Sequence, residues 1–191
     1  MIIKSRAIVL HSFKFGEDKI IVDLFTEEQG RVSFVAPIST SPKAKIKKLY
    51  FQPFSILDIE YDYRQNKSLQ RFKYVGIAFM YDSLQYDSYK LAISLFLAEF
   101  TYYAIRDEQK NIPLFAYVMN SLQWLDGSNG SFSNFHLVYM IHLLKFIGFY
   151  PNLDDYENGF CFDLRNGCYI SMPPFHRDYL SAEDTTLLAT F

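Results

Sequence analysis

The hydrophobic periodicity of this 191-residue chain changes once, near residue 80. Before that point apolar and polar residues tend to alternate, most clearly over residues 54–63, which is the pattern of half-buried β-strands. After it, apolar residues between Leu91 and Ile105 recur at spacings of three and four, which is the pattern of one helical face. We therefore expect a β-rich domain over residues 1–80 and a mainly helical domain over residues 81–191.

Five short β-strands are predicted in the first domain, separated by turn sequences such as Glu28-Gln29-Gly30. Five strands in so short a segment suit a small closed barrel, because closure removes exposed sheet edges. The oligonucleotide-binding (OB) barrel is our first interpretation, and an SH3-like barrel is the alternative with similar strand content. The strands are predicted at residues 6–13, 19–26, 31–36, 54–63 and 68–75.

The second domain is predicted to contain four helices and one small β-hairpin, which makes the whole chain an α+β, multidomain protein. Asp87 or Ser88 can cap the first helix, and Pro113 suits the first turn of the second. Asn166-Gly167 is a strong hairpin signal. The last helix begins at Ser181 and is short, so we expect this domain to be incomplete at its C-terminus.

The charge of the chain divides between the same two halves. Residues 1–80 carry 13 Lys and Arg against 8 Asp and Glu, whereas residues 81–191 carry 6 against 13. The first domain is therefore basic and the second acidic, which indicates a polyanionic partner for the first domain alone. Because no apolar run approaches the roughly 18 residues of a membrane span, and no secretory signal is evident, we expect a cytoplasmic protein without membrane contact.

Four lysines between the third and fourth predicted strands form the strongest local feature: Lys43, Lys45, Lys47 and Lys48. A basic loop on a barrel rim can follow a phosphate backbone by charge alone, although lysine runs are also common on ordinary solvated surfaces. We expect these lysines to bind nucleic acid with other cations of the domain. Those cations are Lys14, Lys19, Arg31, Arg71 and Lys73, and Arg64 and Lys67 add further charge. Nearby aromatic residues that can stack on bases are Phe13, Phe15, Phe34 and Phe72.

Motifs for catalysis and metal binding are weak. The four histidines form no His-x-x-x-His pair, and the chain has neither a Gly-rich phosphate loop nor a Gly-x-Ser-x-Gly motif, so we expect no enzyme. Six residues separate Cys161 from Cys168, more than in a structural zinc half-site, and His176 would add only a third ligand. We therefore expect no zinc and no other cofactor. A magnesium-dependent nuclease is a minor alternative that would use Asp154, Asp155 and Glu157.

Several segments of the first 60 residues resemble one known family. They are Ala7-Ile8-Val9-Leu10, residues 15–21 (FGEDKII), residues 25–31 (FTEEQGR) and, after the basic loop, residues 49–55 (LYFQPFS). These segments resemble the N-terminal signature of the RecO family of DNA recombination mediators. Beyond them the resemblance is only architectural.

The resemblance implies an N-terminal OB barrel that binds single- and double-stranded DNA and anneals complementary strands without catalysis. It also implies a cytoplasmic, nucleoid-associated protein that acts with RecR and the C-terminal tail of SSB, so that RecA loads onto SSB-coated DNA. That tail is acidic with an apolar tip, so within the acidic domain we expect a basic spot at Arg106, Lys110 or Lys145. Many family members carry a four-cysteine zinc site, and the two cysteines here indicate a variant without it. A barrel that serves only as a protein-interaction scaffold is the alternative.

Overall fold

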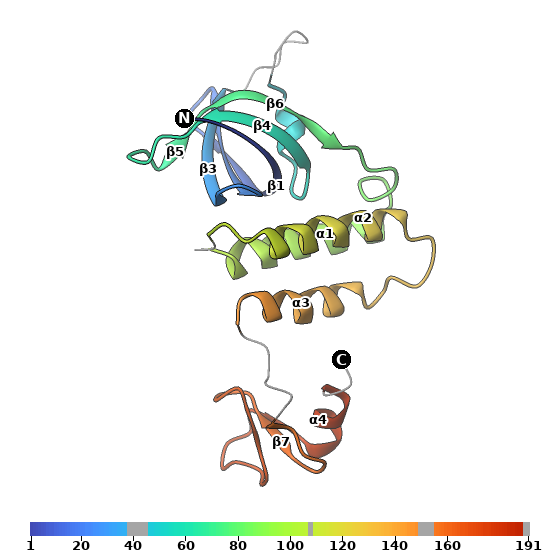
Figure 1. Ribbon diagram of the computed structural model, residues 1–191. Helices are drawn as coiled ribbons and strands as arrows, with labels where there is room; N and C mark the ends of the chain where they lie inside the picture. Colours follow the sequence, from blue (N-terminus) through green and yellow to red (C-terminus); the bar gives the residue numbers. More distant parts are fainter. Residues whose placement is uncertain (38–45, 107–108, 149–154, 189–191) are drawn as a thin grey trace. The chain divides into compact units, whose positions relative to one another are not determined.

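The structure is a computed structural model that describes residues 1–37, 46–106, 109–148 and 155–188. The chain forms two compact units, Met1–Leu143 and Leu144–Phe191, and each is described by itself (Figure 1). The first unit holds a β-barrel and the long helices, and the second holds a small sheet with a short helix. None of the helices in the described ranges is long and apolar enough to cross a membrane.

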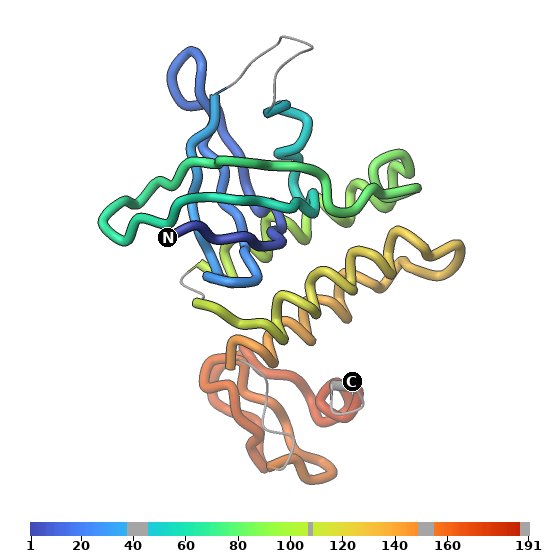
Figure 2. The backbone as a smooth tube through the Cα atoms, turned by 45° about the horizontal axis from the view of Figure 1, so that its top comes forward, coloured from blue at the N-terminus to red at the C-terminus, as the bar shows by residue number. Residues whose placement is uncertain are grey.

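The barrel is a sheet with strand order β5-β3-β2-β1-β4-β6. Arg71 alone separates β5 from β6, so these are two parts of one strand. Its first part pairs with β3 in parallel and its second part pairs with β4 in antiparallel orientation, which closes the barrel (Figure 2). The five-stranded OB barrel is thereby confirmed. The strands are β1 (Ile2–Phe15), β2 (Lys19–Thr26), β3 (Gly30–Pro37), β4 (Ile56–Asp62), β5 (Leu69–Gln70) and β6 (Phe72–Phe79).

Both faces of β2 are buried over most of its length, and both faces of β1 are buried over residues 7–10, which explains why these stretches are almost continuously apolar in sequence. Val9, Val22 and Leu24 belong to the core inside the barrel. Phe25 is also fully buried, and its ring lies 5.8 Å from the ring of Phe115 on the second helix. Helix packing on the outside of β1 and β2 thus completes the core of the first unit.

Three helices follow the barrel, and capping side chains fix where the first two begin. The Asp87 carboxylate accepts hydrogen bonds from the backbone N–H groups of Tyr89 and Lys90, so Asp87 rather than Ser88 is the cap. The first helix ends at Ala104, so Arg106 lies just beyond its last turn. The helices are α1 (Ser88–Ala104), α2 (Ile112–Gly127) and α3 (Phe135–Phe146).

The second unit contains a three-stranded antiparallel sheet with order β8-β7-β9. The predicted hairpin at Asn166-Gly167 is confirmed, and Gly167 has the positive φ of 65° that the turn requires. The Asp163 carboxylate accepts hydrogen bonds from the backbone N–H groups of Arg165 and Asn166 and so fixes the turn. The elements are β7 (Cys161–Asp163), β8 (Cys168–Ile170), β9 (Tyr179–Leu180) and α4 (Ala182–Leu188).

Candidate nucleic-acid interface

Two adjoining hollows on the barrel surface form a strongly basic concave feature. The first, of about 400 Å³, is called the polar hollow because its lining includes Asp62, Arg64, Lys67, Gln70, Arg71 and Lys73. The second, of about 450 Å³, is called the apolar hollow because seven of its nine lining residues are apolar, among them Phe15, Val35 and Phe72. Arg71 and Phe72 line both hollows, and the two together are called the basic cleft.

The basic cleft lies at the end of the barrel where the β1–β2 and β4–β5 connections meet. Arg64 and Lys67 come from the loop between β4 and β5, and Lys19 comes from the first residue of β2. In OB barrels the loop between the first two strands and the loop before the last strand border the face that binds oligonucleotides. The cleft therefore occupies the position at which this type of barrel binds its ligands.

Five exposed cations line the cleft: Lys19, Arg64, Lys67, Arg71 and Lys73. Within the described ranges none of the five forms an ion pair with a carboxylate. The one carboxylate of the cleft, Asp62, accepts a hydrogen bond from the N-terminal ammonium of Met1 at 3.0 Å. That hydrogen bond and the charge of the ammonium lower the pKa of Asp62. The cleft is thus a site of net positive charge.

The buried side chain of Gln70 holds the loop that carries two of these cations. Its Oε1 accepts a hydrogen bond from the backbone N–H of Arg64 at 3.0 Å. Its Nε2 donates to the backbone carbonyls of Arg64 at 3.0 Å and Lys67 at 2.8 Å. One amide therefore fixes both ends of the segment 64–67 without contributing charge.

The four aromatic residues near the basic positions differ in exposure. Phe34 is fully buried, and Phe72 stacks on it with ring centroids 4.4 Å apart and an angle of 10° between the ring planes. Phe72 also stacks on Phe51 at 5.6 Å. Phe13 and Phe15 are 43% and 51% exposed, but of these two only Phe15 lines the cleft. Phe15 and Phe72 are therefore the aromatic residues in position to meet a ligand there.

The structure brings together three of the predicted DNA-binding residues, Lys19, Arg71 and Lys73. Lys14, Lys47 and Lys48 are exposed but do not line the cleft. Lys43 and Lys45 lie outside the described residues. The described residues on either side of that segment, Pro37 and Ile46, both line the apolar hollow.

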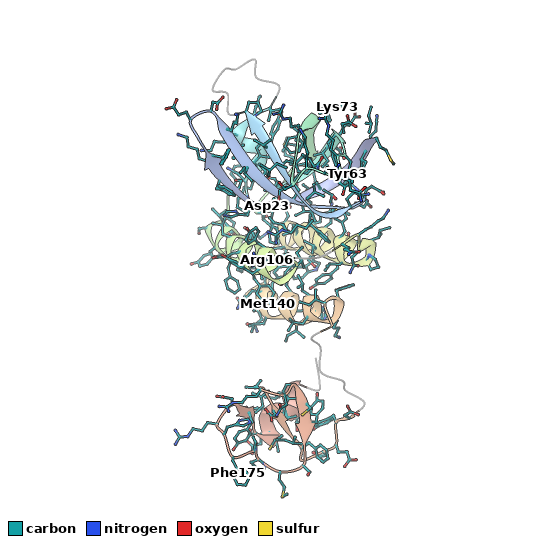
Figure 3. All side chains as sticks on the ribbon, turned by 90° about the vertical axis from the view of Figure 1, so that its left-hand side faces the viewer. Asp23, Tyr63, Lys73, Arg106, Met140 and Phe175 are labelled. Atoms are coloured by element: carbon teal, nitrogen blue, oxygen red, sulfur yellow. The ribbon has the colours of Figure 1, made fainter. Side chains whose placement is uncertain are left out.

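Arg31 lies elsewhere, between β3 and α1. Its guanidinium donates to the backbone carbonyl of Tyr102 at 2.7 Å and lies 4.2 Å from the centre of the Tyr102 ring. It is also 3.9 Å from the Asp23 carboxylate, and the side chain is 13% exposed. Asp23 lies on the side of the barrel that faces the helices, whereas Lys73 lies away from them (Figure 3). Arg31 thus holds the barrel on α1, and its role in DNA binding stays a prediction.

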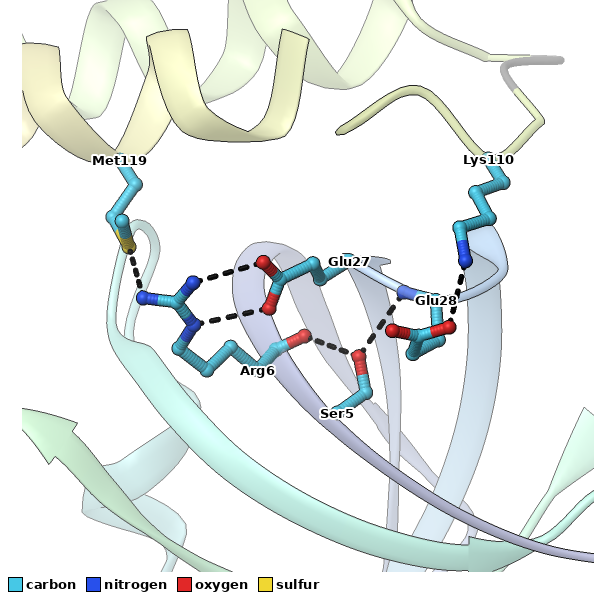
Figure 4. A network of polar contacts seen from close by, with 6 residues as sticks. All are labelled: Ser5, Arg6, Glu27, Glu28, Lys110 and Met119. Atoms are coloured by element: carbon cyan, nitrogen blue, oxygen red, sulfur yellow. Dashed lines mark hydrogen bonds and ion pairs between the residues drawn. The ribbon is translucent and has the colours of Figure 1, made fainter. Parts of the chain in front are cut away.

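Of the three cations predicted to bind a partner, Lys110 is already paired within the protein. Its Nζ lies 2.7 Å from the Glu28 carboxylate (Figure 4). Beside it, the Arg6 guanidinium donates two hydrogen bonds to Glu27, at 3.0 and 2.8 Å, and these contacts lie between the barrel and the helices. Arg106 and Lys145 are exposed, but Lys145 belongs to the second unit. The partner role of the three stays a prediction.

The described cysteines and histidine of the second unit do not come together as a zinc site. Cys161 is buried and Cys168 is exposed, and neither forms a disulfide. The Nε2 atom of His176 lies 3.4 Å from Asp163, which binds the hairpin turn. In the described part of the chain no group of three or more His, Cys, Asp or Glu could hold a metal ion. Asp154, one of the three acidic residues considered for a divalent ion, lies outside the described residues.

The fold and the cleft define an α+β protein whose OB barrel presents a polyanion-compatible surface. Residues 1–81 match the family model described as "Recombination protein O N terminal", and residues 85–168 match "Recombination protein O C terminal". The chain therefore belongs to the RecO family of DNA repair proteins.

Proteins named "DNA repair protein RecO" are similar over nearly the whole chain. The protein from Phocaeicola vulgatus is 42% identical over 186 residues, which cover 97% of this chain and 77% of the relative. The protein from Bacteroides fragilis is 45% identical over 185 residues, covering 96% and 76%. The protein from Flavobacterium johnsoniae is 38% identical over 190 residues, covering 98% and 78%. All three relatives are thus named as DNA repair proteins.

Proposed function

We propose that this protein is a non-catalytic recombination mediator that binds single- and double-stranded DNA through the basic cleft and anneals complementary strands. The observation that carries the proposal is the gathering of five cations without carboxylate partners in one cleft of an OB barrel. Lysine and arginine can neutralise phosphates of any sequence, because the backbone charge is the same along the strand. Two like-charged strands bound in this way repel each other less, which favours annealing.

We further propose that residues 1–80 carry DNA binding and residues 81–191 carry partner contacts. The partners would be RecR and the C-terminal tail of SSB, and together they would help RecA load onto SSB-coated single-stranded DNA. A hollow of about 650 Å³ between α2 and α3, lined by Tyr117, Trp124 and Phe135 among others, suits the apolar tip of such a tail. Arg106 and Lys110, which belong to the same unit as this hollow, would attract its acidic residues, and Lys110 would then exchange its ion pair with Glu28 for one with the tail. Lys145, in the second unit, is kept as a separate candidate contact.

The proposal is tested by fluorescence-anisotropy titration of a labelled single-stranded oligonucleotide with the full chain at several salt concentrations. If all five cations of the cleft meet phosphates, the logarithm of the binding constant should fall with log salt with a slope of about −3.5, since each contact to single-stranded DNA contributes about −0.7. Absence of binding at low salt would favour the alternative, a protein-interaction scaffold. Magnesium-dependent cleavage of the oligonucleotide would instead indicate a nuclease.

Changing Gln70 to Ala should lower the affinity for single-stranded DNA by about five-fold, the equivalent of one hydrogen bond of about 1 kcal/mol. The substitution frees the segment 64–67 but removes no charge, so the salt dependence should stay close to that of the unchanged protein. Gln65→Ala is the matched control, because Gln65 is exposed in the same loop. Equal affinities for the two variants, measured by anisotropy at one salt concentration, would show that Gln70 does not position the loop for DNA.

A further inference from the structure

The two halves of the basic cleft differ in chemistry. Arg64, Lys67, Arg71 and Lys73 all line the polar hollow, where they can neutralise phosphates. The apolar hollow carries only two charged residues, Lys19 and Arg71, and no carboxylate. Arg71 lines both, so a ligand that bridges the halves must be anionic on one side and apolar on the other.

The aromatic surfaces of the apolar hollow suit a flat ring. Phe72 is held in place because it stacks on Phe34 and on Phe51. Phe15, at the end of β1, is 51% exposed and has no ring partner among the described residues. The volume of about 450 Å³ lies within the range of small-molecule binding pockets. One fixed and one exposed phenyl ring thus border a space that an aromatic ligand can enter.

A single-stranded nucleic acid presents the required combination at every residue, because each nucleotide joins an anionic phosphate to a flat, largely apolar base. In a duplex the bases are paired and stacked on one another, so a base must first leave the stack to enter such a space. Peptides with acidic and aromatic side chains share the charge but lack the regular phosphate spacing that five exposed cations can follow.

We propose that the apolar hollow takes an unpaired base of single-stranded nucleic acid, stacked on Phe15 and bordered by Phe72, while the adjoining phosphates lie on the cations of the polar hollow. This inference rests on the proposed DNA binding by the cleft and adds to it a preference for unpaired strands. The cations supply affinity for any strand, and the hollow discriminates between paired and unpaired bases.

The test compares Phe15→Ala with Phe13→Ala in the full chain, because both side chains are about half exposed on β1 and only Phe15 lines the cleft. Three labelled ligands of equal length are titrated: a single strand, the same strand with abasic sites, and a duplex. Phe15→Ala should lower affinity for the intact single strand by roughly ten-fold, in line with the loss of one stacked base. Affinity for the abasic strand and the duplex should change little, and Phe13→Ala should resemble the unchanged protein.

A second readout is 2-aminopurine placed in the single strand, whose emission should rise on binding when the base leaves its stack and should not rise with Phe15→Ala. The inference is overturned if Phe15→Ala weakens the abasic strand or the duplex as much as the intact strand, or weakens none of them. It is also overturned if an acidic, phenylalanine-containing peptide requires Phe15 and the intact strand does not. If the unchanged protein binds none of the three DNA ligands, the proposed function fails as well, so the two failures are distinguishable.

Discussion

Changing Arg64, Arg71 and Lys73 together to Ala is expected to lower affinity for single-stranded DNA by about 100-fold at 0.1 M salt. Each lost phosphate contact removes about 0.7 from the slope of log affinity against log salt, so three lost contacts remove about 2. Because the logarithm of the salt concentration is −1 at 0.1 M, a slope change of about 2 lowers the affinity there by about two powers of ten. All three side chains are exposed, so the fold should be retained. Anisotropy titration across a salt series measures both quantities.

The matched control removes the same charge from outside the cleft by changing Lys4, Arg106 and Arg177 to Ala. All three are exposed, and none lines either hollow. Only a small loss of affinity is expected for this variant, because the overall electrostatic attraction between the protein and DNA becomes weaker. If the control weakens binding as much as the cleft variant, DNA responds to net charge rather than to the cleft. An unchanged slope for the cleft variant would place DNA binding elsewhere.

These experiments use the full chain because the barrel does not stand apart from the helices. Phe25 packs against Phe115 on α2, and Arg31 donates to Tyr102 on α1. In a fragment of residues 1–80, the side chains of Phe25 and Arg31 would be exposed to water. A loss of binding by that fragment would therefore not distinguish a missing DNA contact from a destabilised barrel.

The strands could be predicted because alternation of apolar and polar residues is a local signal, and their number indicated a closed barrel. The pairing that closes the barrel could not be predicted. Closure depends on a parallel pairing of only two residue pairs, Ser33 with Leu69 and Phe34 with Gln70. So short a pairing leaves no pattern in the sequence. Residues 48–51, at the end of the predicted basic loop, form a 3₁₀ turn, because burial of Phe51 in the barrel core orders them.

The positive charge of the candidate site could be predicted from the sequence, but the individual residues that form it could not. Counting cations identified the basic domain, but it could not separate Arg31, which holds α1, from Arg71, which lines the cleft. Gln70 left no signal because a single glutamine in a strand is common, and its role appears only when its amide is seen on the backbone of residues 64–67. The same limit applies to Lys90, whose buried contacts no sequence pattern indicated.

Changing Asp126 to Ala is expected to lower the free energy of unfolding by about 3 kcal/mol or more. The Asp126 side chain is buried at the end of α2, and its carboxylate accepts the backbone N–H groups of Asp82 at 3.0 Å, Ser83 at 2.8 Å and Leu84 at 2.7 Å. These three residues belong to the connection from the barrel to α1. Alanine would leave three N–H groups without partners, and each costs about 1 kcal/mol or more. Urea denaturation at neutral pH measures the loss.

Lys90 contributes to the same cluster from α1. It is 3% exposed, and its Nζ donates to the Ser83 hydroxyl at 2.7 Å and to the backbone carbonyls of Asp126 at 2.8 Å and Ser128 at 2.6 Å. Lys90→Met keeps the length of the side chain and removes all three bonds, so it should destabilise in the same direction. Because both residues hold Ser83, the double variant should lose less than the sum of the two single losses.

The contribution of Asp126 should also depend on pH. Burial alone would raise the pKa of its carboxyl, but the hydrogen bonds from the backbone N–H groups of Asp82, Ser83 and Leu84 outweigh burial and lower it. A lowered pKa in the folded state means that the stabilisation is complete above the unfolded value of about 4 and is lost as the pH falls toward the folded value.

Asp126→Asn keeps the shape of the side chain and cannot ionise, so between pH 5 and pH 3, on either side of the unfolded pKa of about 4, it should lose less stability than the unchanged protein. Asp82→Asn is the control, because the Asp82 side chain is exposed and only its backbone N–H meets Asp126. Its acid dependence should match that of the unchanged protein. If Asp126→Asn shows the same acid dependence as the control, the Asp126 carboxylate does not hold the connection between the barrel and the helices by its charge.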